Sequence, residues 1–197
     1  MVYRINLFLY VLGLALLMGG CGKPQPRNPE RATLNDSSSK ALVQKATQTL
    51  VARLTTQLNA GGPVAAIGYC KVNALSLLDS VAQGQGQLRG LSIRRVSERY
   101  RNPADQPDSL EALALRQLAL TGKPFLQSDS NGNLHYYAPI VLKMDLCLQC
   151  HGKPGTDIAP ATLAALQAAY PTDKATGYQL GDFRGMWHLV QRSPTAQ

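Results

Sequence analysis

Apolar residues recur every three to four positions through the first regular part of the sequence. This pattern starts after the serines at 37–39, which can cap a helix, and stops at the glycine pair Gly61-Gly62. A second helical stripe, which includes Cys70, begins at Pro63 and ends before Gly84-Gln85-Gly86. Two consecutive helices are therefore predicted, with Cys70 on the buried face of the second.

Further along, strand patterns replace helical ones, and one more helix interrupts them. A strand is predicted over Leu91–Val96, followed by a polar loop. Asp108 and Glu111 have the spacing of a capping box, so a helix should start there and end near Gly122. A capped helix is thus expected between the first strand and the remaining strands.

The remaining elements favour an antiparallel sheet. Asn131-Gly132 predicts a hairpin turn between a short strand near Phe125 and a longer strand over 134–143. A helix over 160–170 and a last strand over 183–191 follow. Because helices lead and strands close the chain, without alternating βαβ units, the sequence predicts an α+β fold: a mainly antiparallel sheet flanked by helices, with N-terminal helices.

The first twenty residues have the pattern of an export signal. Arg4 is followed by an apolar run over 5–18, shorter than the ~20 residues that a membrane span needs. Small residues directly before Cys21 match a lipobox, so we expect Cys21 to be lipidated; the alternative is an ordinary secretory signal. The protein is thus expected in the cell envelope, lipid-anchored, facing the periplasm or another extracytoplasmic space.

These patterns divide the chain into four parts. Residues 1–20 are predicted to be a lipoprotein signal peptide, 21–39 a flexible tether, 40–192 one domain, and 193–197 a tail. One core is expected, because domains of roughly 100–150 residues are the most common. Apolar residues make up 45% and charged residues 16% of the chain, which excludes a wholly disordered protein.

The five residues from Cys147 to His151 read Cys-Leu-Gln-Cys-His, the spacing of c-type haem attachment. In that motif both cysteines form thioethers with the haem vinyl groups, and the adjacent histidine binds the iron. A thioredoxin-like redox pair would need a βαβ context, and a zinc site would need a second ligand pair. The sequence shows neither. One covalent haem c, held by Cys147, Cys150 and His151, is therefore expected.

The far face of the iron is either open or filled by a second side chain, and that choice decides the function. Iron-binding side chains elsewhere in the sequence are Cys70, Met144, Met186, His135 and His188. Cys70 is the one cysteine without another assignment, which is unusual in an exported protein. On the residues alone, a distal ligand and a buried free thiol are equal alternatives for Cys70.

A set of short motifs accompanies the haem motif over about 41–190. They are Gly62-Pro63, Ala66-Ile67, Cys70, Arg95-Val96-Ser97, Arg101-Asn102-Pro103, Pro107, Tyr170-Pro171, Asp173, Ala175, Gly177-Tyr178, Gly181-Asp182 and Arg184-Gly185. With this set the sequence resembles the small PAS-like c-type haem domains of exported proteins and bacterial sensor receptors. The resemblance implies a PAS-like sheet with the haem against it, and His151 and Cys70 as the two axial ligands.

The net charge of +8 at pH 7 comes from scattered lysines and arginines. That scatter, together with the export signal, argues against a nucleic-acid partner. Solubility and counter-charge for haem propionates explain the excess instead. Arg95, Arg99 and Arg101 are the candidate propionate partners, because guanidinium groups pair bidentately with carboxylates. The alternative is that these arginines are solvated loop residues.

The expected function follows from the ligand pair. A thiolate opposite a histidine favours ferric iron, and its bond should weaken on reduction, opening a site for CO or NO. The hypothesis is a redox or gas sensor in which the Cys70 helix moves. The alternative is an electron-transfer cytochrome c. An enzyme is not expected, because no distal acid or base pattern stands out. Without a transmitter domain downstream, a separate signalling partner is expected.

Overall fold

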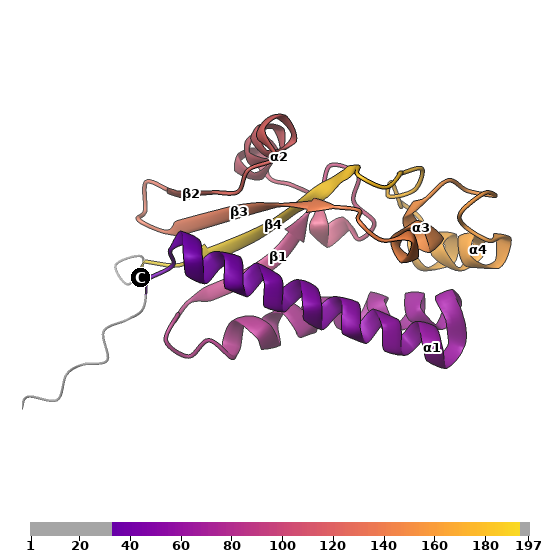
Figure 1. The fold of residues 1–197 in the computed structure, drawn as a ribbon. Coiled ribbons are helices and arrows are strands. Elements are labelled where there is room, and N and C mark those ends of the chain that lie inside the picture. The colour runs from indigo at the N-terminus through magenta and orange to yellow at the C-terminus, as the bar shows by residue number, and fades with distance from the viewer. Residues whose placement is uncertain (1–32, 194–197) are drawn as a thin grey trace, which may run out of the picture. The chain divides into compact units, whose positions relative to one another are not determined.

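The computed structural model describes residues 33–193, so the predicted signal peptide, Cys21, and most of the predicted tether and tail lie outside the described residues. The elements are α1 (Asp36–Gln83), β1 (Leu91–Val96), a short 3-10 helix (Pro103–Asp105), α2 (Ser109–Thr121), β2 (Phe125–Ser128), β3 (Leu134–Val141), α3 (Asp145–His151), α4 (Pro160–Ala169) and β4 (Phe183–Gln191) (Figure 1). This combination of helices and strands confirms the α+β class.

The strands form one antiparallel sheet in the order β1-β4-β3-β2. Side chains of β4 alternate between the two faces of the sheet. Trp187 and Leu189 pack in the cluster that contains α1, whereas Met186 packs in the cluster that contains α2. The two helices therefore cover opposite faces of the sheet, as Figure 1 shows. The predicted sheet flanked by helices is confirmed.

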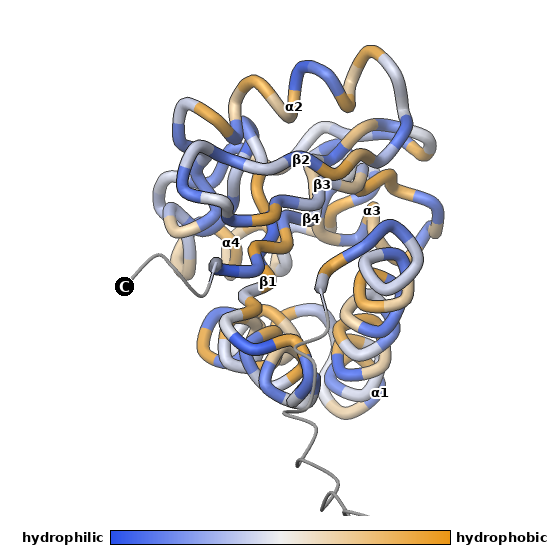
Figure 2. Tube along the Cα trace, turned by 90° about the vertical axis from the view of Figure 1, so that its left-hand side faces the viewer, coloured by the Kyte–Doolittle hydropathy of each residue, from blue (hydrophilic) through white to orange (hydrophobic). Residues whose placement is uncertain are grey.

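Helix α1 consists of two antiparallel arms. Helical geometry is interrupted at Gly61 and Gly62, and Gly62 has a φ of 69°, a left-handed conformation that glycine adopts without steric cost. The chain turns back there, so that the two arms lie side by side (Figure 2). Leu42 of the first arm and Leu78 of the second share one buried cluster. The two predicted helices are confirmed. By length and hydropathy alone α1 is long enough to cross a membrane, but both arms pack in this cluster.

The first arm of α1 begins earlier than the sequence pattern predicts. Asn35 Oδ1 accepts a hydrogen bond from the Ser38 backbone N–H at 2.9 Å, and Ser38 Oγ accepts one from the Asn35 N–H at 3.0 Å. This capping box starts the helix at Asp36. Leu34 is also buried, at 2% exposure, in the α1 cluster. The folded domain thus includes Leu34 and the start of α1, which lie within the predicted tether of 21–39.

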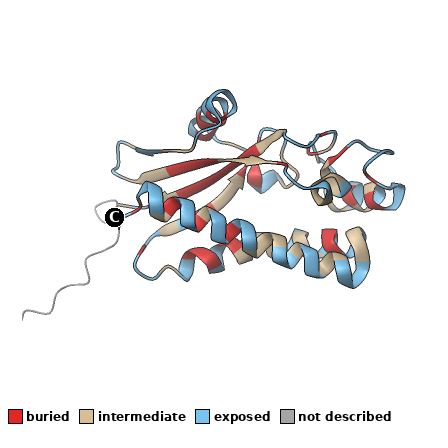
Figure 3. Cartoon of the chain, viewed as in Figure 1, coloured by how far each residue is buried: buried red, intermediate tan, exposed pale blue. Residues whose placement is uncertain are grey.

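Elsewhere the local signals give the predicted elements. Asp108 caps α2 by accepting from the Glu111 N–H at 2.8 Å, and Glu111 accepts from the Asp108 N–H at 3.0 Å. Gly122 ends α2 with a φ of 62°. The hairpin between β2 and β3 and the last strand, β4, also match. Burial is concentrated in the central strands and in the helix faces that pack on them (Figure 3).

Candidate functional site

The Cys-Leu-Gln-Cys-His motif forms a short helix, α3, which the sequence pattern does not predict. The helix ends at Gly152, where an added Cβ would lie only 2.5 Å from the Asp157 Cβ. Two backbone hydrogen bonds join this end to the loop before β4. Gly177 N–H donates to the Gly152 carbonyl at 2.7 Å, and Tyr178 N–H donates to the His151 carbonyl at 2.9 Å. The loop thereby fixes the backbone of the motif histidine.

The side chain of His151 is oriented by a backbone carbonyl. His151 Nδ1 lies 2.7 Å from the Ala175 oxygen and must donate to it, since a carbonyl only accepts. Burial, followed by the positive charges of Arg101 and Arg184, holds the pKa of His151 well below its usual value of 6.5. At neutral pH the ring is therefore uncharged, and Nε2 keeps a lone pair. A histidine held in this way has the tautomer of a metal ligand.

Cys70, on the second arm of α1, is brought to the same region. Burial raises the pKa of its thiol, and the positive charges of Arg95 and Arg101 act against that rise. Burial also raises the pKa of the Cys150 thiol, and the charge of Cys70 contributes to that rise. Cys70 is half-buried, so its helix face is less enclosed than predicted. It is unbridged, like Cys147 and Cys150.

The other candidate iron ligands lie elsewhere. His188 Nδ1 is 2.7 Å from Glu111 Oε1, and its Nε2 is 3.0 Å from His135 Nδ1. The remaining nitrogen, His135 Nε2, lies 3.2 Å from Asp129 Oδ2. All four ring nitrogens are thus engaged. Met186 is fully buried against α2, on the sheet face opposite α1.

Met144 lies at the start of the motif helix itself. It is the N-cap residue of α3, and its side chain is 42% exposed. A residue on the element that carries His151 is poorly placed to reach the opposite face of a haem. Of the candidates that the sequence offers, the fold thus brings Cys70 to the haem motif from a separate element.

A partly buried charged cluster adjoins the site. Arg95 Nη2 lies 3.9 Å from Asp105 Oδ2, and Arg184 Nη1 donates to Ser97 Oγ at 2.8 Å. Nevertheless, Arg95 Nε, Arg184 Nε and Asp105 Oδ1 are buried without a hydrogen-bond partner, three of the five such side-chain atoms in residues 33–193. Burial lowers the pKa of Arg184, and the charges of Arg101 and Arg95 lower it further. Two arginine Nε–H groups therefore lack an acceptor, and Asp105 Oδ1 lacks a donor.

Arg99 already donates to backbone carbonyls. Its guanidinium group binds the oxygens of Lys174, at 3.2 Å, and Thr176. The group also stacks on Tyr178, with 3.8 Å between the guanidinium carbon and the ring centroid. Arg99 therefore anchors the loop that holds His151.

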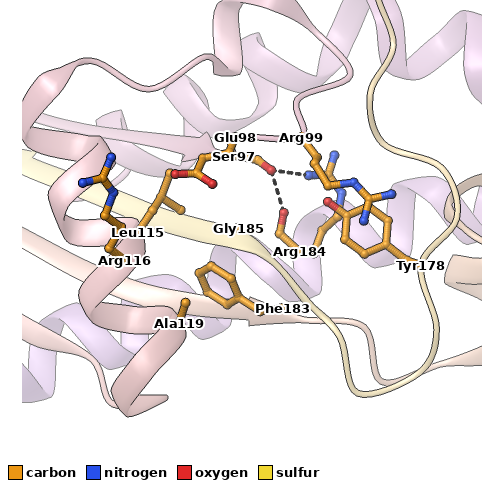
Figure 4. Close-up of a pocket in the computed structure, with 10 residues that line it drawn as sticks. All are labelled: Ser97, Glu98, Arg99, Leu115, Arg116, Ala119, Tyr178, Phe183, Arg184 and Gly185. Carbon is orange, nitrogen blue, oxygen red and sulfur yellow. Dashed lines mark hydrogen bonds between the residues drawn. The ribbon is translucent and has the colours of Figure 1, made fainter.

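Arg99, Arg184 and Tyr178 line a pocket of about 150 Å³, whose other side includes Leu115 and Phe183 (Figure 4). In that view the two guanidinium groups lie beside the tyrosine ring. Sites for small molecules usually measure roughly 300–1,000 Å³. We therefore do not assign this pocket to a haem.

Comparison with known proteins identifies the family of this chain. The model of the Tll0287-like family matches residues 27–191. The chain belongs to the Tll0287-like family. Among solved structures it is similar to the crystal structure of the cyanobacterial haem protein Tll0287, with 24% sequence identity and a TM-score of 0.61, over 82% of this chain and 99% of that chain. This likeness shows the fold. No curated protein matches the chain.

Two features of this Tll0287-like site do not follow from residue type. The acceptor for His151 is a backbone carbonyl, which has no sequence signal of its own, although Ala175 belongs to the motif set. Arg184 also belongs to that set, but it reaches the site only because β4 pairs with β1, with Arg95 opposite Trp187. Once that register is known, the alternation of side chains places Arg95 on the same sheet face as Trp187. Arg184 lies at the register shift between Ile140 and Val141, so alternation gives no such signal for it.

Proposed function

We propose that this chain is an exported, lipid-anchored protein that binds one haem covalently through Cys147 and Cys150. His151 and Cys70 serve as axial ligands, and the protein acts as a redox or small-gas sensor rather than as an enzyme. The observation that carries this proposal is the hydrogen bond from His151 Nδ1 to the Ala175 carbonyl. It presents Nε2 for metal binding from within an attachment motif.

The residues around the motif fit a haem. Four arginines lie around the motif, and only two aspartates pair with members of this group. The arginines are Arg95, Arg99, Arg101 and Arg184, and the aspartates are Asp105 and Asp173. The two propionates of a haem would balance the remaining positive charge. The buried Nε atoms of Arg95 and Arg184 lack acceptors, and propionate oxygens would supply them.

A haem also fits the small number of ligands available. Within residues 33–193, no three His, Cys, Asp or Glu side chains converge on a metal-sized site. The porphyrin supplies four nitrogens, so its iron needs only two side chains from the protein. This scarcity of ligands argues against the zinc alternative, which needs four.

We assign the propionate role first to Arg95 and Arg184. Arg99 and Arg101 contribute positive charge, while their guanidinium groups donate to protein acceptors. The neighbour Tll0287 is described as a haem protein, which supports the same cofactor here. When bound, the haem would supply a redox-active iron able to bind a small gas.

The proposed ligand exchange and movement involve the residues of the chain itself. Cys70 sits on the arm of α1 that follows the Gly61-Gly62 turn. Burial raises the pKa of its thiol, and the positive charges of Arg95 and Arg101 oppose that rise. If the Cys70 sulfur leaves its ligand position, the second arm is free to shift about this turn, as hinges at glycines allow. The second arm is therefore the proposed two-state element, and a separate protein would detect its movement.

The sensor and the electron carrier differ in what reduction does. We expect CO to change the optical spectrum of the haem-loaded protein only after reduction, because the thiolate bond should weaken in the ferrous state. The measurement is a pair of CO titrations followed by absorbance, with EPR of the oxidised protein. If the reduced protein keeps both axial ligands and excludes CO, the electron-transfer cytochrome becomes the better proposal.

Membrane attachment through Cys21 is proposed from the lipobox. A Cys21→Ser variant should lose the acyl group and move from the membrane fraction to the soluble extract of the cell envelope. Immunoblotting of both fractions, with mass spectrometry of the N-terminus, measures this. Cys70→Ser is the matched control and should stay with the membranes. Unchanged membrane abundance of Cys21→Ser, with cleavage at the same bond, would argue against lipidation.

A further inference from the structure

Arg101, in the loop after β1, is bound by three acceptors around the haem motif. Its Nε donates to Asp173 Oδ2 at 3.0 Å, and its Nη2 donates to the carbonyl oxygens of Cys150 at 2.6 Å and Ala175 at 3.2 Å. The Arg101 side chain is 13% exposed and that of Asp173 9%. Because the guanidinium group is planar and rigid, it fixes these acceptors relative to one another.

The Ala175 carbonyl therefore accepts two hydrogen bonds. One comes from His151 Nδ1 at 2.7 Å, and the other from the cationic Arg101. Asp173 Oδ1 holds the same residue from the other side, accepting from the Ala175 N–H at 2.7 Å. A hydrogen bond from a cation withdraws electron density from the carbonyl oxygen, so the oxygen is a weaker acceptor for His151.

We propose that Arg101 and Asp173 are positioning residues that set the electron-donor strength of His151. The inference rests on the proposed function and deepens it, because it gives Arg101 a role through one carbonyl rather than through propionate charge. A weaker Nδ1–H hydrogen bond leaves Nε2 a weaker donor to a metal ion. A weaker donor and a nearby positive charge both favour reduced iron, so Arg101 should raise the reduction potential of the iron.

The test compares Arg101→Gln with Arg99→Gln in the haem-loaded protein by spectroelectrochemistry. Arg99 is a matched control, because it also carries one charge and donates to two backbone carbonyls, but not to that of Ala175. We expect Arg101→Gln to shift the midpoint potential to lower values, and Arg99→Gln to shift it clearly less. Arg101→Lys keeps the charge without the planar fork, so its potential should fall between that of Arg101→Gln and wild type.

A second measurement, proton NMR, probes the hydrogen bond from His151 to the Ala175 carbonyl in the absence of haem. In the haem-free protein, the Nδ1 proton of His151 should move downfield in Arg101→Gln, because the freed Ala175 carbonyl accepts more strongly. Arg101→Lys should show a smaller shift in the same direction and serves if Arg101→Gln does not fold. Equal potentials and equal proton shifts in the Arg101→Gln and Arg99→Gln proteins would overturn the proposal. A wild type without haem would refute the proposed function, while the proton shift would still decide this inference.

Discussion

Replacing both Cys147 and Cys150 with serine should reduce covalently retained haem from one per chain to none. A serine hydroxyl forms no thioether with a vinyl group, and a haem held only by axial ligands is removed by acidified acetone. The measurement is intact mass spectrometry after extraction, on protein produced in a host with c-type maturation machinery. Wild type should exceed the mass of its acylated polypeptide by one haem.

The matched control for this pair is Cys70→Ser, which also replaces a half-buried, unbridged cysteine of the same region. Its mass gain should persist, because both attachment cysteines remain. Wild-type protein without retained haem would show that the motif is not an attachment site. Haem mass that survives in the double variant would place the covalent bonds on other residues.

Much of the fold could be predicted because its signals are local. The reciprocal hydrogen bonds of Asp108 and Glu111 join residues three apart, so the sequence alone identifies the start of α2. The break in α1 is also local, since Gly62 takes a φ that other residues avoid. Local signals mislead at Asn35, which accepts a hydrogen bond from the Ser38 N–H and caps α1. The surrounding stretch is polar, and such a composition is typical of tethers.

The site itself depends on contacts between distant segments. The Arg101 bonds to Cys150 and Asp173 join parts of the chain that no local pattern relates. His135 and His188 are able to bind iron by residue type, although histidines in predicted strands are more often surface or core residues than ligands. They bond each other and two carboxylates instead, since antiparallel pairing of β3 with β4 brings them to one face of the sheet. Strand pairing therefore shows that these two histidines belong to a hydrogen-bonded cluster, which their residue type alone does not show.

Cys70→Ala should change the iron site more than any other single substitution outside the motif at 147–151. Without the sulfur, the ferric protein should change from low-spin to high-spin, or take water as its sixth ligand. The midpoint potential should rise, because the thiolate charge that stabilises ferric iron is gone. EPR of the oxidised protein and spectroelectrochemistry measure the two effects. The mass gain of one haem should remain.

Met186→Leu is the control that separates the two ligand assignments. Leucine has nearly the volume of methionine, so the buried α2 cluster should tolerate the exchange while losing the thioether sulfur. We expect its spectrum and potential to match wild type. The opposite result, an unchanged Cys70→Ala protein and an altered Met186→Leu protein, would make Cys70 a structural thiol and favour the electron carrier. Met186 packs against α2 and Cys70 lies on α1, across the sheet, so repacking around one residue should not imitate loss of the other.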